Sequence, residues 1–339
     1  MTLTKVKLEG FTAFADLEVR FSPGINALIG ENGTGKTHLM KVCYAACDVA
    51  KTGENFADKL VRVFLPSGRV LGRMTRRRQG TSRGAATVYR DDRSLRTAFS
   101  NRAKVPGNVR AEGIERWMDD SLESVYIPVK DMLANAPGFN ALYARREIHF
   151  EEIYADILER AYLPALRGPS DRARRSLRTA LQKAIDGRAT VRNGEFFLSN
   201  KQGNLEFALL AEGMRKLGLL WLLIQNGTLQ SGSVLFWDEP ETNLNPKMYG
   251  IVMNVLLELQ RAGVQVFFAT HDYVILKELD LQMTEEDAVA FHSLYRDEDG
   301  EIACYTSHGY LDIRPNAISD TFTSLYDREI ERSFGGRLR

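Results

Sequence analysis

The sequence predicts an α/β protein whose main sheet is mostly parallel. Three observations lead to this prediction. Residues 25–29 (Ile-Asn-Ala-Leu-Ile) form a short apolar run that reads as a buried strand, and a helix is expected over 38–49 after a glycine-rich loop. A second apolar run, 233–237, ends in two adjacent carboxylates. From residue 195 onward, predicted strands alternate with predicted helices, which is typical of a parallel sheet covered on both faces.

The remaining elements of the first half follow from local patterns. Two strands are expected at 5–8 and 17–21. Residues 60–89 alternate valine and arginine between glycine-containing turns, which predicts a small antiparallel sheet. Residues 124–128 are expected to add a strand to the main sheet. Apolar side chains at near-helical spacing predict a helix over 151–163.

The second half is expected to be largely helical between its strands. A helix that begins at a Ser170–Asp171 cap should run to about residue 185. Further helices are predicted at 212–225 and 248–262, and a strand at 264–269. The acidic run 297–300 reads as the Asp-Gly turn of a hairpin rather than as a metal site. A last amphipathic helix, 316–334, is expected to dock on the protein's own core, with docking on a partner as the alternative.

Composition and charge narrow the class of protein. The 339 residues are 44% hydrophobic and 26% charged, as in soluble proteins with a substantial core, and could form one large domain or two. The longest apolar run, near 217–224, is too short to cross a bilayer, and the first residues read as a strand rather than a secretory signal. Cys43, Cys47 and Cys304 lack the clustering of a zinc site. We expect a cytoplasmic protein that makes no membrane contact.

The glycine-rich loop predicts a phosphate-binding site. Its backbone N–H groups can turn toward phosphate oxygens at the positive end of the following helix. Lys36 would reach the β- and γ-phosphates, and the Thr37 hydroxyl would ligate Mg²⁺. A glycine-rich turn that matches by chance is the alternative. The expected ATP-binding residues are Gly30, Glu31, Asn32, Gly33, Thr34, Gly35, Lys36, Thr37 and His38.

The paired carboxylates predict the chemistry at that site. Asp238 ends its strand where a magnesium-bound water could be held, so it is the second expected Mg²⁺ ligand beside Thr37. Glu239 is placed to take a proton from an attacking water. Two solvated residues at a strand end are the alternative. Together with the loop, the pair predicts ATP hydrolysis with Mg²⁺ as cofactor.

The charge is distributed unevenly along the chain. Residues 59–110 contain 14 Lys/Arg and 2 Asp/Glu, a net charge of +12, whereas the remainder carries −11. Such a segment suits nucleic acid or an acidic partner protein, and a solvated basic surface is the alternative. The residues expected to form this patch are Arg73, Arg76, Arg77 and Arg78.

Four further segments, in order, resemble the ABC-type ATPase heads of the SMC and OLD (overcoming lysogenisation defect) proteins. Residues 8–33 resemble the start of these heads, and 210–216 (Leu-Ala-Glu-Gly-Met-Arg-Lys) resembles their signature motif. Residues 238–246 resemble the second carboxylate motif with its following loop, and 269–272 the segment of the switch histidine. The 240–246 segment is most similar to the OLD branch of AAA ATPases, whose members include subunits of the Septu and Gabija anti-phage systems.

The resemblance implies a P-loop ABC-type ATPase head with a small antiparallel β subdomain and an inserted helical lid. The expected division is a core formed by 1–54 and 195–310, a basic sheet with a helical insertion at 55–194, and a helical tail at 311–339. It also implies that two heads sandwich two ATP molecules. Ala211, Glu212 and Gly213 would contact ATP from the second chain. His271 would join Glu239 as a catalytic residue by contacting the γ-phosphate from the same chain and sensing hydrolysis, and an ordinary histidine at a strand end is the alternative.

Two departures from the family pattern bear on turnover. Ala211 stands where the signature motif usually has serine, and Met214 replaces a polar residue. We therefore expect either slow hydrolysis or a protein in which ATP binding matters more than hydrolysis. The hydroxyl's lost charge-assisted hydrogen bond is worth about 1.5–3 kcal/mol. The residue that corresponds to the glutamine loop is left open among Gln79, Lys130 and Asp131.

Three functions compete at this point. The first is a sensor or scaffold for a separate effector, a nuclease or toxin, in anti-phage defence, acting as a homodimer or higher oligomer. Only 68 residues follow His271, fewer than the nuclease domain of full OLD nucleases needs. The second is a DNA-repair or chromosome-maintenance ATPase that clamps DNA with residues 59–110. The third is a scaffold that keeps ATP only to hold its dimer together.

Overall fold

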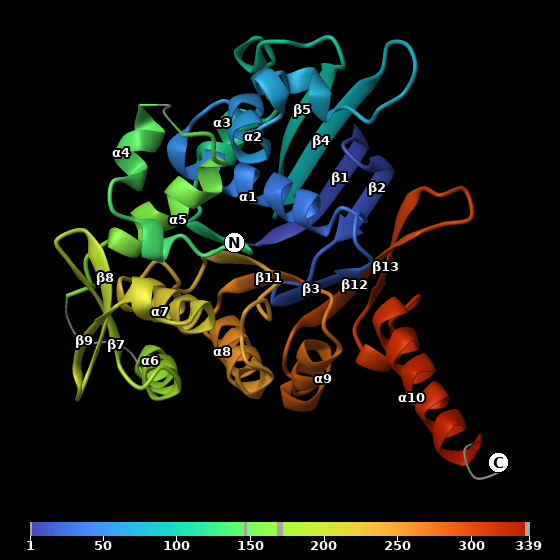
Figure 1. Cartoon of the computed structure of the whole chain (residues 1–339). Coiled ribbons are helices and arrows are strands. Elements are labelled where there is room, and N and C mark those ends of the chain that lie inside the picture. Colours follow the sequence, from blue (N-terminus) through green and yellow to red (C-terminus); the bar gives the residue numbers. More distant parts are fainter. Residues whose placement is uncertain (1, 146–147, 168–171, 336–339) are drawn as a thin grey trace.

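The main sheet is mostly parallel, as the sequence predicts. The computed structural model describes residues 2–145, 148–167 and 172–335. The sheet has the strand order β13-β12-β3-β11-β10-β6, and only the β12–β13 pair is antiparallel (Figure 1). Its strands are β3 (Ile25–Gly30), β6 (Ser124–Ile127), β10 (Val234–Asp238), β11 (Gln265–Thr270), β12 (Val289–Arg296) and β13 (Ile302–Ser307). The predicted fold class is therefore confirmed.

A second, antiparallel sheet lies across helix α1 (Lys36–Thr52) from the main sheet (Figure 1). Its order is β2-β1-β4-β5. The strands are β1 (Leu3–Phe11), β2 (Phe14–Arg20), β4 (Arg83–Arg90) and β5 (Arg93–Ser100). Helix α1 touches strands of both sheets and is buried along most of its length. The two sheets therefore enclose the helix, including its charged residues Lys36, Lys41 and Asp48.

The prediction of a self-contained antiparallel sheet over 60–89 is wrong in its first part. Residues 56–64 form helix α2 (Phe56–Phe64), because the Asn55 side chain caps it by accepting hydrogen bonds from two backbone N–H groups. The sheet strand begins only at Arg83, and β4 pairs with β1 from the start of the chain. The division that we propose at residue 55 therefore separates strands of one sheet.

Helices and a third small sheet surround the two main layers. The predicted helices at 151–163, 212–225 and 248–262 are all present, and the hairpin β12–β13 turns at the predicted Asp-Gly step. The expected cap at Ser170–Asp171 lies outside the described residues. The remaining elements are α3 (Ile114–Met118), α4 (Phe139–Ala144), α5 (Glu152–Tyr162), α6 (Arg172–Ala184), β7 (Arg188–Arg192), β8 (Glu195–Asn200), β9 (Gly203–Glu206), α7 (Glu212–Gln225), α8 (Tyr249–Arg261) and α9 (Tyr273–Gln282).

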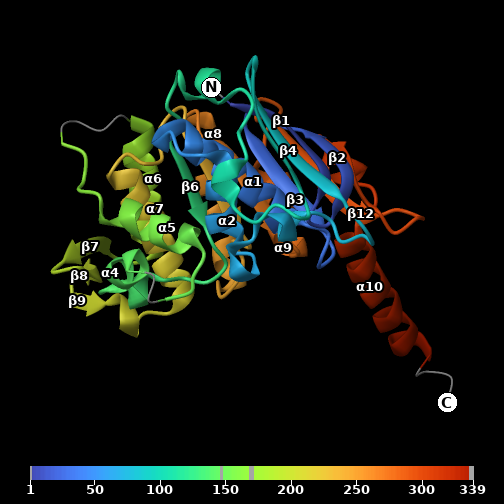
Figure 2. The same cartoon turned by 90° about the horizontal axis from the view of Figure 1, so that it is seen from above.

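Helix α10 (Ala317–Gly335) extends away from the body of the protein (Figures 1 and 2). Only its beginning docks: Ile318 packs against the core and the Phe322 ring stacks on Tyr273 at a centroid distance of 4.5 Å. Farther along, Leu325 and Tyr326 are 50% and 62% exposed. The expectation that the whole apolar stripe docks on the core is therefore wrong. Across the described part of the chain, every helix is too short or too polar to span a membrane.

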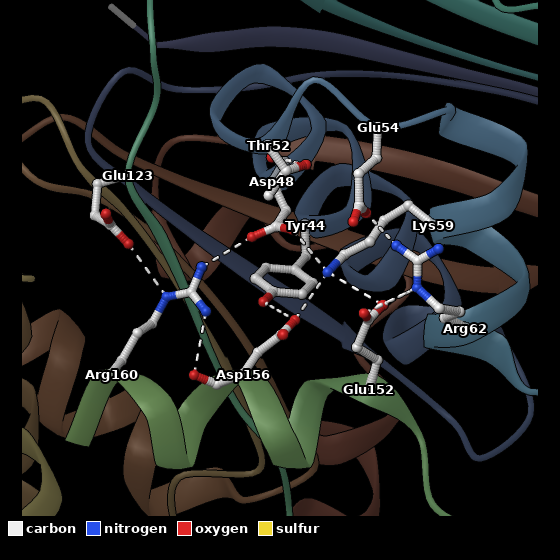
Figure 3. Close-up of polar contacts among 10 residues, drawn as sticks. All are labelled: Tyr44, Asp48, Thr52, Glu54, Lys59, Arg62, Glu123, Glu152, Asp156 and Arg160. Carbon is white, nitrogen blue, oxygen red and sulfur yellow. Dashed lines mark hydrogen bonds and ion pairs between the residues drawn. The ribbon is translucent and has the colours of Figure 1, made fainter. Parts of the chain in front are cut away.

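A buried ion-pair network joins α5 to α1 and α2 (Figure 3). The Lys59 ammonium, 2% exposed, lies 2.7 Å from Asp48, 3.2 Å from Glu152 and 2.9 Å from Asp156. Burial alone would lower the pKa of Lys59, but these three carboxylates outweigh it and raise the pKa. On the other side, the Arg160 guanidinium lies 2.9 Å from Asp48. The helical insertion is therefore held to the phosphate-loop helix by charge.

We predict that Lys59→Met lowers the free energy of unfolding by about 3–5 kcal/mol, because it removes the cation that three largely buried carboxylates share. Urea unfolding followed by circular dichroism measures this change. The matched control is Lys5→Met, since the Lys5–Glu18 pair is solvent-exposed and such pairs contribute about 0–1 kcal/mol. Equal, small losses in both variants would contradict the stabilising role of the network.

Candidate functional site

The predicted site residues meet at one edge of the main sheet. Strands β3, β11 and β10 are parallel neighbours, so their carboxyl ends lie at the same edge. β3 leads into the glycine-rich loop, and β10 ends at Asp238. The Thr37 hydroxyl consequently lies 3.3 Å from Asp238 Oδ1, although 201 positions separate the two residues.

The glycine-rich loop has a backbone that requires glycine. At Gly30, with a φ of 143°, a Cβ atom would lie 2.1 Å from the Leu294 carbonyl oxygen. At Gly35, with a φ of 89°, it would lie 2.4 Å from the Phe14 ring. Gly35 is the N-cap of α1, and no side chain caps the N–H groups of the first turn. Those donors point into the loop, which suits an anion.

Lys36 lies over the loop in a defined position. Its side chain is buried, and its ammonium donates to the carbonyls of Gly30 at 2.7 Å and Glu31 at 2.9 Å. Burial lowers the pKa of Lys36, and the nearby Asp238 and Glu239 oppose that shift. The loop therefore places the Lys36 ammonium at the mouth of the anion-binding N–H groups.

Asp238 is buried and oriented through both of its oxygens. Oδ1 accepts from Thr37, and Oδ2 accepts from the Tyr126 hydroxyl at 3.1 Å. Burial raises the pKa of Asp238, and the two hydrogen bonds oppose this shift. Tyr126 is absent from the predicted site because its contact depends on the pairing of β6 with β10, which no local pattern shows.

Glu239 and His271 form a direct pair. Glu239 has a φ of 49°, in the left-handed region that non-glycine residues rarely occupy. Its carboxylate accepts from His271 Nε2–H at 2.8 Å and from the Thr242 hydroxyl at 2.9 Å. Burial raises the pKa of Glu239, but these hydrogen bonds outweigh it and lower the pKa. These hydrogen bonds therefore favour the ionised form of Glu239.

The loop after Glu239 is anchored by a residue that sequence reasoning did not select. Glu241 Oε1 accepts from the Thr270 hydroxyl at 2.7 Å and from the His271 backbone N–H at 3.1 Å. Glu241 therefore connects the loop after Glu239 to the end of β11 and holds the backbone of His271 in position. Its position inside the predicted 238–246 motif was the only signal in the sequence.

The converging side chains line a pocket of about 200 Å³. Small-molecule sites commonly measure roughly 300–1,000 Å³, so this pocket is smaller than a typical ligand site. A larger hollow, about 1090 Å³, lies between the end of β2 and the β12–β13 hairpin, away from these residues. The residues that line the smaller pocket are Ala13, Asn32, Gly33, Gly35, Lys36, Thr37, His38, Asp238, Glu239 and His271.

His38 is neutral at this site. Burial lowers its pKa to about 4, and its ring lies 5.4 Å from that of Phe64. Its Nδ1 atom is buried and has no hydrogen-bond partner within the described part of the chain. Glu31 and Asn32 are exposed at the rim, and Thr34 is buried with its hydroxyl donating to the Glu31 carbonyl at 2.9 Å.

The signature residues lie outside the pocket of their own chain. Ala211 precedes α7, and Glu212 at its start accepts from the Asn243 side chain at 2.8 Å. A Cβ atom on Gly213 would lie 2.7 Å from the Asn243 carbonyl oxygen. The signature segment is therefore packed against the loop that follows Glu239, so movement of one would displace the other.

Asp131 connects the loop after β6 to the signature segment and the start of α7. Its side chain is 2% exposed and lies 2.6 Å from Arg215 of α7, and its backbone N–H donates to Glu212 at 3.2 Å. Asp131 follows β6, at the sheet edge that carries the site. Gln79, in contrast, lines a separate groove beside Arg76 and Arg78. Of the three residues left open for the glutamine loop, Asp131 contacts the signature segment.

The basic segment 59–110 is partly neutralised. Arg73, Arg77 and Arg78 are exposed, whereas Arg76 is half-buried and paired with Glu301. Arg90 is buried and donates to the carbonyls of Trp117 and Asp120 rather than to solvent. The sequence charge of this segment therefore overstates its exposed charge. The other cations with carboxylate partners are Lys59, Arg62, Arg93 and Arg96.

The family model described as "AAA domain, putative AbiEii toxin, Type IV TA system" matches residues 25–277. This range contains the glycine-rich loop, both carboxylates and His271. The chain belongs to this AAA-domain family.

Curated relatives of this AAA-domain chain match it over short stretches. A DNA replication and repair protein RecF from Bacillus mycoides is 34% identical over 83 residues, which are 24% of this chain and 22% of the relative. RecF from Limosilactobacillus reuteri is 46% identical over 44 residues, 13% of this chain and 12% of the relative. The chain thus spans less than a quarter of the length of these two relatives.

Solved structures share the fold over nearly the whole chain. An SmcHead bound to the C-winged helix domain of ScpA superposes with a TM-score of 0.58 at 13% identity, covering 91% of this chain and 98% of the other. An Smc head from Pyrococcus furiosus with an extended coiled coil, bound to the C-terminal domain of ScpA, gives 0.54 at 12% identity, covering 97% and 99%. The architecture is therefore that of SMC head domains.

Proposed function

We propose that this chain binds and hydrolyses ATP with Mg²⁺. The observation that carries the proposal is the convergence of Lys36, Thr37, Asp238, Glu239 and His271 on one pocket. Lys36 and the α1 N–H groups would bind the phosphates. Glu239 would accept a proton from the attacking water, and His271 would hold that carboxylate in place through the 2.8 Å hydrogen bond.

The residues present fit a magnesium ion. Thr37 and Asp238 offer a hydroxyl and a carboxylate, the hard oxygen ligands that Mg²⁺ prefers, and they lie 3.3 Å apart. Groups of three or more His, Cys, Asp or Glu suited to a metal are absent from the described residues, which agrees with an ion held mainly by phosphates and water. When bound, Mg²⁺ would neutralise charge on the β- and γ-phosphates.

We further propose that two copies enclose two ATP molecules. The pocket of one chain is small, and Ala211, Glu212 and Gly213 lie outside it. A second copy could present these residues, with the N-terminus of its α7, to the γ-phosphate. The contact between Glu212 and Asn243 would then connect each interface to the loop after Glu239 of the same chain.

In cells, we propose a sensor or scaffold role with a separate effector in anti-phage defence. The family description, which names a putative toxin of type IV toxin–antitoxin systems, and the OLD-like carboxylate loop support this role. The SMC heads of similar fold were solved with parts of ScpA bound, so this architecture has precedent for holding a partner protein. Cytoplasmic action fits the three cysteines, which form no disulfide in the described chain.

We predict that Glu239→Gln reduces the rate of phosphate release by about 10²–10⁴-fold, because glutamine cannot accept the proton from water. ATP affinity, measured by calorimetry, should change less than about threefold. The control is Glu286→Gln at an exposed position outside the pocket, which should leave both quantities unchanged. An unaltered rate in Glu239→Gln would contradict the base assignment. Full cellular activity without hydrolysis would support ATP as a ligand that only holds the dimer.

A second prediction concerns pH. Glu239 has to be ionised to accept a proton, and the hydrogen bond from His271 helps lower its pKa. His271→Ala removes that bond, so the pKa of Glu239 should rise and the acidic limb of the kcat/KM profile should move to higher pH. His271→Gln keeps an N–H donor and should move the limb less. An acidic limb at the same pH in all three proteins would contradict the pairing.

A DNA-clamping ATPase is the second candidate function. The RecF relatives, whose name describes DNA replication and repair, favour it, as do the exposed side chains of Arg77 and Arg78. Arg77 and Arg78 belong to the predicted patch. A separate groove beside α6, β7 and β8, of about 610 Å³, is lined by Lys183, Arg188 and Lys201.

For this candidate, we predict that reversing both charges in Arg77→Glu/Arg78→Glu lowers affinity for duplex DNA about tenfold or more. The slope of log affinity against log salt should fall by about two, one unit for each lost phosphate contact. The matched control is Lys183→Glu/Arg188→Glu, which changes the same charge on the other basic surface. Affinity is measured by fluorescence anisotropy. Equal DNA affinity in the wild-type protein and the Arg77/Arg78 variant would contradict DNA clamping by this patch.

A further inference from the structure

Tyr126 contacts Asp238 but has no role in the ATPase function proposed above. It lies in the edge strand β6, with its Cα opposite that of Phe236 in β10, and its side chain is almost completely buried. Its hydroxyl donates to Asp238 Oδ2 at 3.1 Å. The other oxygen of the same carboxylate accepts from Thr37. These are the two side-chain hydrogen bonds that the described structure gives to Asp238.

We propose that Tyr126 is a positioning residue that holds the Asp238 carboxylate in the orientation needed to ligate Mg²⁺, a role that rests on the ATPase function proposed above. The terminal torsion of an aspartate is broad, so hydrogen bonds decide which oxygen faces a ligand. The Tyr126 hydroxyl occupies Oδ2, which directs Oδ1 to the side of Thr37. Mutation of groups that orient metal ligands in this way commonly lowers metal affinity by about tenfold or more.

A neutral donor suits this position better than a cation would. Lysine or arginine beside Asp238 would also fix the carboxylate, but its charge would compete with Mg²⁺ for the same anion. A phenol donates one hydrogen bond and leaves the negative charge of Asp238 available to the metal. Lys36, which lies over the loop, donates its hydrogen bonds to the carbonyls of Gly30 and Glu31 and not to Asp238.

The Tyr126 ring is itself held by aromatic side chains of two other elements. It stacks on Phe236 of β10 at a centroid distance of 6.3 Å and an angle of 18°, and meets the Tyr44 ring of α1 edge-on at 5.6 Å. The Tyr44 hydroxyl donates to Asp156 of α5 at 2.6 Å (Figure 3). Asp156 in turn belongs to the Lys59 network. The Tyr126 hydroxyl, which contacts Asp238, is therefore held in place by packed aromatic rings.

Tyr44 supplies a matched control for the experiment. Tyr44→Phe and Tyr126→Phe each remove one buried hydroxyl and keep the ring, but only Tyr126 contacts Asp238. The binding of a non-hydrolysable ATP analogue is titrated against Mg²⁺ for the wild-type protein and both variants, with thermal melting to verify that each is folded. The electron paramagnetic resonance spectrum of Mn²⁺ in the nucleotide complex gives a second readout of the metal ligands.

The proposal predicts that Tyr126→Phe raises the half-saturating Mg²⁺ concentration by roughly tenfold. At saturating Mg²⁺ its kcat should stay within about threefold of the wild-type value, and its Mn²⁺ spectrum should change. Tyr44→Phe should shift the half-saturating Mg²⁺ concentration less than about twofold and leave the Mn²⁺ spectrum unchanged.

Two results would overturn the positioning role. One is a Mg²⁺ dependence in Tyr126→Phe equal to that of the wild-type protein. The other is an equal shift in both variants, which would show that any lost buried hydroxyl loosens the site. Failure of the underlying function looks different, because the wild-type protein would then bind no analogue at any Mg²⁺ concentration.

Discussion

The candidate site depends on the parallel order β3-β11-β10 in the main sheet. Parallel neighbours end at the same edge, so the phosphate loop after β3 and the carboxylates after β10 meet although they are distant in sequence. The 3.3 Å contact between Thr37 and Asp238 is the direct product of this order. Each further site residue is placed relative to that contact: Tyr126 from β6 on one side, and His271 from the end of β11 on the other.

Charge and packing hold the site together from outside. Helix α1 carries the phosphate loop at its beginning and, three turns later, Asp48, which pairs with Lys59 of α2 and Arg160 of α5. The insertion is thereby attached to the same helix whose first turn follows the glycine-rich loop. On the opposite side, Glu212 and Asp131 join the signature segment to the loops after β10 and β6. Loops that would have to respond to the γ-phosphate therefore share hydrogen bonds.

Local pattern predicted the parts whose signal is local. The loop 30–37, the strand that ends at Asp238 and the helices at 212–225 and 248–262 each combine a clear period with recognisable ends. The helix at 56–64 was missed because its arginine and valine positions also fit a strand, and the Asn55 cap decided between them. Tyr126 and the Lys59 network could not be predicted, since both depend on pairing between distant elements. The residues of the candidate site were therefore predictable from the sequence, but the contacts from distant elements that hold them in place were not.

The central claim is that this edge of the sheet binds ATP through Lys36 and a magnesium ion on Thr37 and Asp238. Titration of ATP into the purified protein by isothermal calorimetry tests it most directly, with and without millimolar Mg²⁺. We expect one ATP bound per chain with Mg²⁺ and weaker binding without it. The Lys36→Ala variant should show no binding heat. The absence of any saturable heat with Mg²⁺ in the wild-type protein would contradict it.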